Sequence, residues 1–410
     1  MTYSRDSREA KKRRLRDNII ISKESGKDSK GLSLIVFIVL LICAAGIAFG
    51  AYWMLNRNLS ESYSIMWVKS QDSEEGPVET FKGYKSFAGG IIRYTKDGAE
   101  YIDRGGNIVW ERSYQLNSPI VDVSEKFAVI GDQGSTKLYI FDSKGMTGSS
   151  ETLLPVSILR IADSGVVYAV LNDNAAEYIT AFKPDGSAID LSVKSIFKGD
   201  GYPFAIDSSP DGTELITSYI SIESGVPVND VVFRNFGAIG QNEDARRIVG
   251  GFRDEFAGHM VGSVNFSTNE FSQAFYDGGV VFFSTEVLNS PEIIVNHSFE
   301  ERIESVDASG ETVALLLEAD KGAGNQKLVI FSVSGEKKAE IELDFDCQEM
   351  CMTESFTVLR SENRLYVYGK NGVLRAEFEY TDGDIVEIAG GGEKDELFVI
   401  TAADIVRIKY

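Results

Sequence analysis

Tyr139-Ile-Phe-Asp-Ser-Lys-Gly145 is the stretch that decides the fold, because the chain repeats its pattern. Three more segments end an apolar run with an aromatic residue and place a glycine four positions later: Thr180-Ala-Phe-Lys-Pro-Asp-Gly186, Val329-Ile-Phe-Ser-Val-Ser-Gly335 and Tyr366-Val-Tyr-Gly-Lys-Asn-Gly372. A looser copy ends at Gly106. The pattern predicts a strand whose aromatic side chain packs between sheets. A tight turn follows, where glycine supplies a positive φ, and then an outer strand.

Two further apolar strands precede each copy, so the repeating unit has about four strands. That unit is typical of a β-propeller blade. We therefore predict an all-β protein, a β-propeller with eight blades, with seven as the alternative count. A stack of β-sandwiches is the competing architecture, but it would not repeat this strand ending. The predicted units are 81–117, 118–155, 156–200, 201–258, 259–300, 301–346, 347–382 and 383–410.

The last unit contains only three obvious strands. The segment Ser64–Ser70, SIMWVKS, could supply the fourth from the other end of the chain. Closure of this kind would leave no sheet edge open at the junction. We therefore expect Ser64–Ser70 to pair beside Asp404–Tyr410.

A membrane anchor is predicted ahead of this strand. Residues 31–56 contain no charged side chain, and about 20 apolar residues suffice for a transmembrane helix. A cleaved signal peptide would have a shorter apolar core. Basic residues that precede the segment indicate a cytoplasmic N-terminus, and the topology-determining residues are Lys11, Lys12, Arg13, Arg14 and Arg16.

The predicted anchor divides the charge of the chain. Residues 1–30 hold ten Lys and Arg and five Asp and Glu, out of 41 and 62 in the whole chain. The remainder therefore holds 31 basic and 57 acidic residues, a net charge of −26. An acidic domain of this kind repels nucleic acid and attracts cations or basic partners. Solubility of an exported domain would explain the charge as well.

These patterns predict a single-pass protein of the cell membrane, with an extracytoplasmic C-terminal domain. Its predicted parts are a basic cytoplasmic tail (1–30), a transmembrane signal anchor (31–56), a juxtamembrane segment with a possible closing strand (57–80) and the propeller (81–410).

A family resemblance rests on these motifs. The aromatic strand endings resemble blades of quinoprotein-type and WD40-like propellers, and Ser208-Ser-Pro-Asp-Gly212 resembles a hairpin of TolB-type periplasmic proteins. The short basic tail, the single span and the acidic propeller together are similar to an uncharacterised family of membrane-anchored propellers from Gram-positive bacteria. That family is a domain of unknown function, so the resemblance implies an architecture and no active site.

Catalytic motifs are not apparent in the sequence. His259 and His297 are isolated in sequence, and each is expected to be hydrogen-bonded rather than to bind a metal. Glycines 390–392 precede acidic residues, which favours a hairpin loop over a phosphate site. Asp97, Asp211 and Asp307 are read as turn residues. Trp67 and Trp110 lie in no recognisable cofactor motif. We expect no cofactor and no metal, and no catalytic residue is assigned.

Cys347 and Cys351 form the one candidate site. An even pair of cysteines in an oxidising compartment suggests a disulfide, with a redox pair or half of a metal site as alternatives. A bridge needs Gln348–Met350 to turn, because extended residues would hold the two Cα atoms too far apart.

The function expected from the sequence is that of a binding or scaffolding module for an envelope protein, peptide or glycan, held by the lipid bilayer and not binding nucleic acid. The alternatives are a glycan-active enzyme that uses carboxylates and a single-pass sensor that signals through the tail. Carboxylates of raised pKa gathered in a deep pocket would favour the enzyme.

Overall fold

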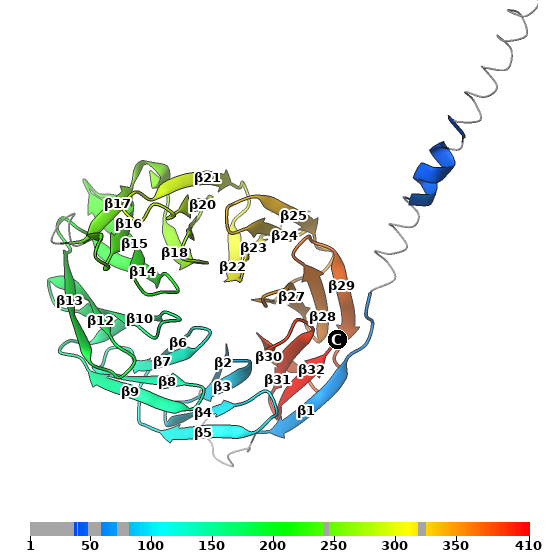
Figure 1. Cartoon of the computed structure of the whole chain (residues 1–410), viewed down its shortest axis with the longest axis horizontal. Helices are drawn as coiled ribbons and strands as arrows, with labels where there is room; N and C mark the ends of the chain where they lie inside the picture. The colour runs from blue at the N-terminus through cyan, green and yellow to red at the C-terminus, as the bar shows by residue number, and fades with distance from the viewer. Residues whose placement is uncertain (1–36, 39, 48–58, 72–81, 241–245, 319–324) are drawn as a thin grey trace, which may run out of the picture. The chain divides into compact units, whose positions relative to one another are not determined.

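The computed structural model describes residues 37–38, 40–47, 59–71, 82–240, 246–318 and 325–410. The chain forms two compact units, Met1–Leu59 and Ser60–Tyr410. The second unit is a ring of eight four-stranded antiparallel sheets around a central channel (Figure 1). The predicted eight-bladed propeller is therefore confirmed.

Blades 1 to 4 follow the chain from the innermost to the outermost strand. Blade 1 comprises β2 (Gly83–Phe87), β3 (Gly90–Tyr94), β4 (Gly98–Ile102) and β5 (Ile108–Ser113). Blade 2 comprises β6 (Pro119–Val123), β7 (Phe127–Asp132), β8 (Lys137–Asp142) and β9 (Gly145–Glu151). Blade 3 comprises β10 (Val156–Ile161), β11 (Val167–Asn172), β12 (Ala176–Phe182) and β13 (Ala188–Ile196). Blade 4 comprises β14 (Tyr202–Ser208), β15 (Glu214–Glu223), β16 (Val226–Asn235) and β17 (Ile248–Phe252), and the 3₁₀ helix η2 (Asp254–Phe256) follows it.

Blades 5 to 8 complete the ring. Blade 5 comprises β18 (Val261–Phe266), β19 (Phe271–Tyr276), β20 (Gly279–Ser284) and β21 (Glu292–Ser298). Blade 6 comprises β22 (Ile303–Ser309), β23 (Thr312–Leu317), β24 (Lys327–Ser332) and β25 (Lys337–Glu342). Blade 7 comprises β26 (Glu349–Met352), β27 (Phe356–Ser361), β28 (Arg364–Gly369) and β29 (Leu374–Glu379). Blade 8 comprises β30 (Ile385–Gly390), β31 (Glu396–Thr401), β32 (Asp404–Lys409) and, outermost, β1 (Ser64–Ser70).

Each blade contributes to two hydrophobic cores, because successive side chains of a strand point to opposite faces. In β12, Tyr178 and Phe182 pack into the core shared with blade 2. Ile179 and Ala181 pack into the core shared with blade 4. A strand that is buried on both faces needs a neighbour on each side, so a stable array of such blades has to close on itself.

The repeated glycine has a second role that the sequence pattern did not predict. The preceding aromatic residues are buried and the glycines adopt positive φ, as expected. At Gly186, Gly335 and Gly372, although not at Gly145, the turn also packs closely against the outermost strand of the preceding blade. A Cβ on Gly186 would lie 2.3 Å from the Ser149 oxygen of β9, and one on Gly335 would lie 2.4 Å from Val295 of β21. Glycine therefore permits contact between blades as well as the turn.

The two ends of the chain close the ring, as the sequence predicted. β1 pairs antiparallel with β32 along its length, from Ser64 opposite Lys409 to Ser70 opposite Asp404. Trp67 Nε1 donates a hydrogen bond to the Arg104 carbonyl of blade 1 at 3.0 Å. Just before β1, Ser60 exchanges two backbone hydrogen bonds of 2.9 Å with Arg375 and Glu377 of β29. The N-terminal segment therefore joins blades 7, 8 and 1.

The predicted anchor falls mostly outside the described residues, and the predicted tail 1–30 lies wholly outside them. Within the anchor, residues 37–38 and 40–47 are helical. Among the residues that the structure describes, no helix has both the length and the apolar character that crossing a bilayer requires.

We expect Gly186→Ala to destabilise the propeller more than Gly225→Ala does. Both glycines have φ near 82°, but nothing lies within 4 Å of a Cβ on Gly225. Alanine should cost about 1–2 kcal/mol at either position through backbone strain, and overpacking against β9 should add about 1–3 kcal/mol at position 186. Urea unfolding followed by tryptophan fluorescence measures the difference. Equal losses would show that the contact between blades carries no free energy.

Candidate functional site

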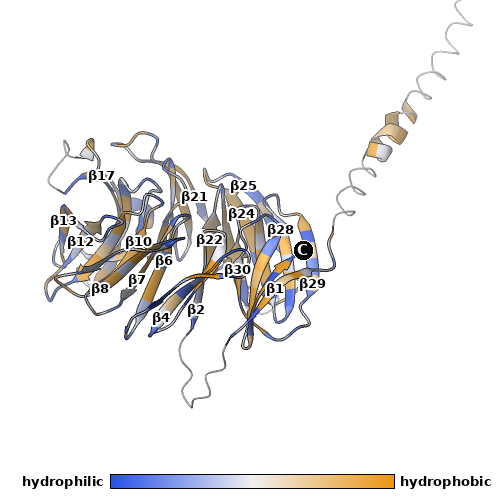
Figure 2. Ribbon diagram, turned by 60° about the horizontal axis from the view of Figure 1, so that its bottom comes forward, coloured by the Kyte–Doolittle hydropathy of each residue, from blue (hydrophilic) through white to orange (hydrophobic). Residues whose placement is uncertain are grey.

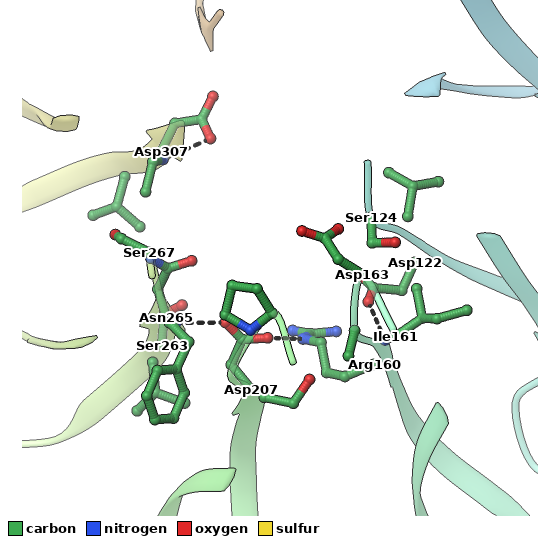
Figure 3. A pocket seen from close by; sticks show the side chains of 18 of the residues that line it. Asp122, Ser124, Arg160, Ile161, Asp163, Asp207, Ser263, Asn265, Ser267 and Asp307 are labelled. Carbon is green, nitrogen blue, oxygen red and sulfur yellow. Dashed lines mark hydrogen bonds and ion pairs between the residues drawn. The ribbon is translucent and has the colours of Figure 1, made fainter. Parts of the chain in front are cut away.

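A cavity of about 470 Å³ occupies the central channel. The innermost strands of six consecutive blades contribute charged or amide side chains to its lining. This channel ring consists of Lys85, Asp122, Arg160, Asp207, Asn265 and Asp307, and Figure 3 shows all of them except Lys85 with labels. Together with Asp163, which also lines the cavity, four carboxylates and two cations therefore meet in one confined space.

The three aspartates of the channel ring also join neighbouring blades. Asp122 Oδ2 accepts a hydrogen bond from the Ile161 backbone N–H, Asp207 Oδ2 from Phe266 and Asp307 Oδ2 from Met352, each at 2.7 Å. Every bond runs from the innermost strand of one blade to that of the next, so blades 2, 4 and 6 are bonded to blades 3, 5 and 7. Hydrogen bonds to a charged group are among the stronger ones in proteins.

Confinement raises the pKa of these carboxyls. Burial is the main cause for Asp122, Asp207 and Asp307, and it raises the pKa of Asp207 to about 7 against the opposing effect of Arg160. The Arg160 Nε lies 3.9 Å from Asp207 Oδ1. Glu387 of β30 also has a pKa raised to about 7, again chiefly by burial. The channel therefore changes its charge near neutral pH.

One mouth of the channel is strongly acidic. It is formed by the turns between the first and second strands of the eight blades, and we call these turns the rim: 88–89, 124–126, 162–166, 209–213, 267–270, 310–311, 353–355 and 391–395. The rim carries eight acids and only Lys126 and Lys394 as bases, a net charge of −6. The acids are Glu125, Asp163, Asp211, Glu270, Glu311, Glu354, Glu393 and Asp395.

A second cavity of about 1140 Å³ opens at this rim. Turns of blades 1, 2, 6, 7 and 8 line it, including Glu125, Glu354 and Glu393. It shares Val123, Ser124 and Ala308 with the channel cavity. The rim and the channel therefore form one continuous funnel.

The two candidate disulfide residues are free thiols, and Cys347 is buried in a hydrophobic core. Cys351 lines the second cavity, and the Cys347 thiol donates to the Glu349 carbonyl at 3.3 Å. The turn expected at 348–350 is not formed, because β26 is extended from Glu349 onward to pair with β27. Burial raises the pKa of Cys347 to about 11 and also raises that of Cys351, which disfavours reactive thiolates. A bridge would require β26 to be remodelled, and the disulfide stays a prediction.

Other sequence-based assignments have mixed outcomes. His259 Nδ1 bonds Asp277 at 2.8 Å and His297 Nε2 bonds the Gly335 carbonyl at 2.7 Å, so both histidines are hydrogen-bonded as expected. Glycines 390–392 lie at the turn between β30 and β31, also as expected. The prediction that Asp307 is a turn residue is wrong: it lies within β22 and faces the channel.

Within the described ranges, no three His, Cys, Asp or Glu side chains are grouped to hold a metal ion. The basic residues Lys11 to Arg16 lie outside those ranges.

The channel aspartates carry a sequence signal that repeat analysis overlooked. Val121-Asp-Val-Ser124, Ile206-Asp-Ser-Ser209 and Val306-Asp-Ala-Ser309 share one pattern, an apolar residue, aspartate, a variable residue and serine. Among the innermost strands, the pattern occurs at those of blades 2, 4 and 6 and is absent from those of the blades between them, so it does not have the one-blade period of the strand endings.

Comparison with known proteins agrees with the fold. Residues 57–410 match the model described as "Family of unknown function (DUF5711)". In structure the chain is similar to Sqt1 from Chaetomium thermophilum, with a TM-score of 0.55 and 12% identity over 84% of this chain and 99% of that one. It is also similar to BamB from Moraxella catarrhalis, with a TM-score of 0.50 and 11% identity over 85% of this chain and 100% of that one. These identities establish the fold alone. No curated protein matches the chain in sequence.

We expect Asp207→Asn to become more stable relative to the native protein as pH rises from 5 to 8. The unfolded Asp207 carboxyl ionises near pH 4, whereas its folded pKa is about 7. Between these values the folded state keeps a proton that the unfolded state releases, so the native protein loses stability as pH rises. Asparagine cannot ionise and still accepts a hydrogen bond from the Phe266 N–H. The free energy of unfolding of the variant relative to the native protein should therefore rise by about 1–3 kcal/mol between pH 5 and 8.

Urea unfolding at both pH values measures this difference in the free energy of unfolding. Asp185→Asn is the control, because hydrogen bonds from Ser187 lower the pKa of that exposed carboxyl and its effect should not change between pH 5 and 8. A difference for Asp207→Asn that stays constant would contradict the raised pKa.

Proposed function

Since the chain belongs to the family of unknown function DUF5711, we propose a function from its geometry: the propeller is an anchored scaffold that binds a basic segment of an envelope protein at its acidic rim. One observation carries the proposal. Seven of the eight rim turns bear an acid, and they surround a funnel that reaches the channel ring.

Electrostatics favour a basic protein segment over other ligands. A concave surface of one charge raises the local concentration of oppositely charged groups and speeds their association. Lysine and arginine side chains could contact the rim, while the channel ring beneath it offers carboxylates for a residue that enters more deeply. Nucleic acid and acidic glycans would be repelled by the same charge. A glycan partner thus fits less well than a protein partner.

The anchor is the second part of the proposal. Residues 31–56 are uncharged, and the described helical residues within them present their apolar side chains outward. Phe37, Leu41 and Ile47 are 63%, 57% and 73% exposed. Exposure of such side chains to water is unfavourable, and a bilayer would cover them. The basic residues before them orient the propeller outside the cytoplasm.

A carboxylate-dependent glycan enzyme is the alternative function, and the raised pKa values in the channel favour it. Such an enzyme needs one protonated and one ionised carboxyl. Each channel aspartate, however, uses one oxygen to bond the next blade, which is a structural role. Asp207→Asn separates the two functions, because it would abolish turnover of a glycan, whereas the eight rim acids that provide most of the proposed peptide affinity stay unchanged.

A reporter test addresses topology. We expect alkaline phosphatase fused after Tyr410 to be active, since this enzyme matures only outside the cytoplasm. Replacement of Lys11, Lys12, Arg13, Arg14 and Arg16 by glutamine should invert part of the population, because the positive charges hold the tail inside. Full activity of a cytoplasmic reporter at the same position in the native sequence would refute the anchor's orientation.

A charge-neutralising variant addresses the rim. We expect Glu125→Gln combined with Glu354→Gln and Glu393→Gln to weaken binding of a fluorescent Lys/Arg octapeptide about tenfold, because three attractive charges of about 0.5 kcal/mol each are lost. The effect should shrink at high salt. Fluorescence anisotropy gives the affinity.

The control removes three exposed acids from outermost strands, Glu111, Glu292 and Glu340, by the same substitution. It should leave the affinity within about twofold, since exposed charges more than a Debye length away are largely screened. Equal weakening by both sets would mean that the peptide responds to net charge and not to the rim.

A further inference from the structure

The exposed apolar side chains of the propeller's circumference are concentrated at one place. Eight large apolar residues of the outermost strands are exposed, and five of them belong to β1 and β5. We call these five the outer wall: Ile65, Met66, Val68, Ile108 and Val109. β1 and β5 are adjacent on the circumference (Figure 1), and β1 carries hydrophobic colouring in Figure 2.

The five side chains are exposed for a structural reason. Trp67 turns inward and covers the glycine turn of blade 1 at Gly106, and Trp110 stacks on Phe141 of blade 2. Alternation along each strand then points Met66, Val68 and Val109 outward. Ile65 and Ile108 lie at register shifts of the sheets, where strict alternation is interrupted. Each of the five is 43–52% exposed. In a domain of net charge −26, β1 and β5 together carry only Lys69, Glu111 and Arg112.

The short segment between the predicted span and the propeller, which we call the tether (residues 57–59), limits how far the outer wall can lie from the membrane. The predicted span ends at Asn56, and Ser60 is already hydrogen-bonded to β29. Four Cα–Cα steps reach at most about 14 Å. The headgroup layer on one side of a bilayer is about 5–8 Å thick. If residues 31–56 span a bilayer, the propeller surface that receives Ser60 has to lie within a few ångströms of the headgroups, and β1 begins four residues later.

We propose that the outer wall rests on the lipid surface, with its apolar side chains in the interfacial layer. This inference depends on the anchor in the proposed function. Apolar side chains gain free energy in the headgroup and acyl boundary, and the tether holds them there at high effective concentration. Lys69 and Arg112 add attraction to anionic headgroups. A wall placed in this way leaves the rim and the channel uncovered.

Photo-cross-linking in vesicles tests the wall. The full chain is reconstituted in vesicles of phosphatidylethanolamine and phosphatidylglycerol that contain radiolabelled lipid, with p-benzoylphenylalanine in place of either Val68 or Ile294. Ile294 lies on β21 in blade 5, across the ring, and at 42% is similarly exposed. We expect at least about fivefold more lipid adduct at position 68, because the tether keeps that side at the bilayer.

The outcomes separate the wall from the anchor. Equal amounts of lipid adduct at both positions would contradict the proposal that the outer wall rests on the lipid surface. Protein–protein adducts at position 68 would also contradict it, and would indicate that another copy of the chain covers the outer wall. Carbonate extraction of the same vesicles tests independently whether the chain is anchored in the membrane. Protein that resists extraction but forms no lipid adducts at position 68 would contradict only the proposed contact of the outer wall with lipid. Protein that is extracted would contradict both the anchor and this contact.

Discussion

Pairing of β1 with β32 is the interaction on which the rest of the structure depends. Every blade is apolar on both faces, so seven complete blades would still leave two open faces and an eighth sheet with an unpaired strand. The seven residues Ser64–Ser70 supply the missing strand and bring blade 8 against blade 1 through Trp67. Without that closure the innermost strands would not enclose a channel, and the six polar residues of the channel ring would not converge.

Closure also places the N-terminal segment at one side of the ring. The strand that completes blade 8 comes directly from the segment that pairs with β29. Ring closure and the proposed attachment therefore involve the same blades, 7, 8 and 1. The rim, in contrast, is formed by turns of all eight blades, and seven of these turns bear an acid. The proposed binding at the rim and the proposed attachment at the circumference are thereby separated within one ring.

Sequence patterns predicted the parts of the fold that are local and repeated. Aromatic–glycine strand endings revealed the blades, because a buried aromatic side chain and a positive φ require the same residue types in each blade, as at Phe331 and Gly335. The close approach of Gly186 to Ser149 has no such sequence pattern, because it depends on how one blade packs against the next. The extended course of the chain between Cys347 and Cys351 likewise left no signal in the sequence, because it depends on pairing of β26 with β27.

The channel site escaped sequence analysis because its residues are far apart in the chain and are chemically ordinary. Asp122, Asp207 and Asp307 are three among 62 acidic residues, and only ring closure gives them a common environment. That environment then determines their chemistry. Burial raises the pKa of Asp207 although the Phe266 N–H and Arg160 both act to lower it, and this burial is a property of the assembled ring and not of the residue.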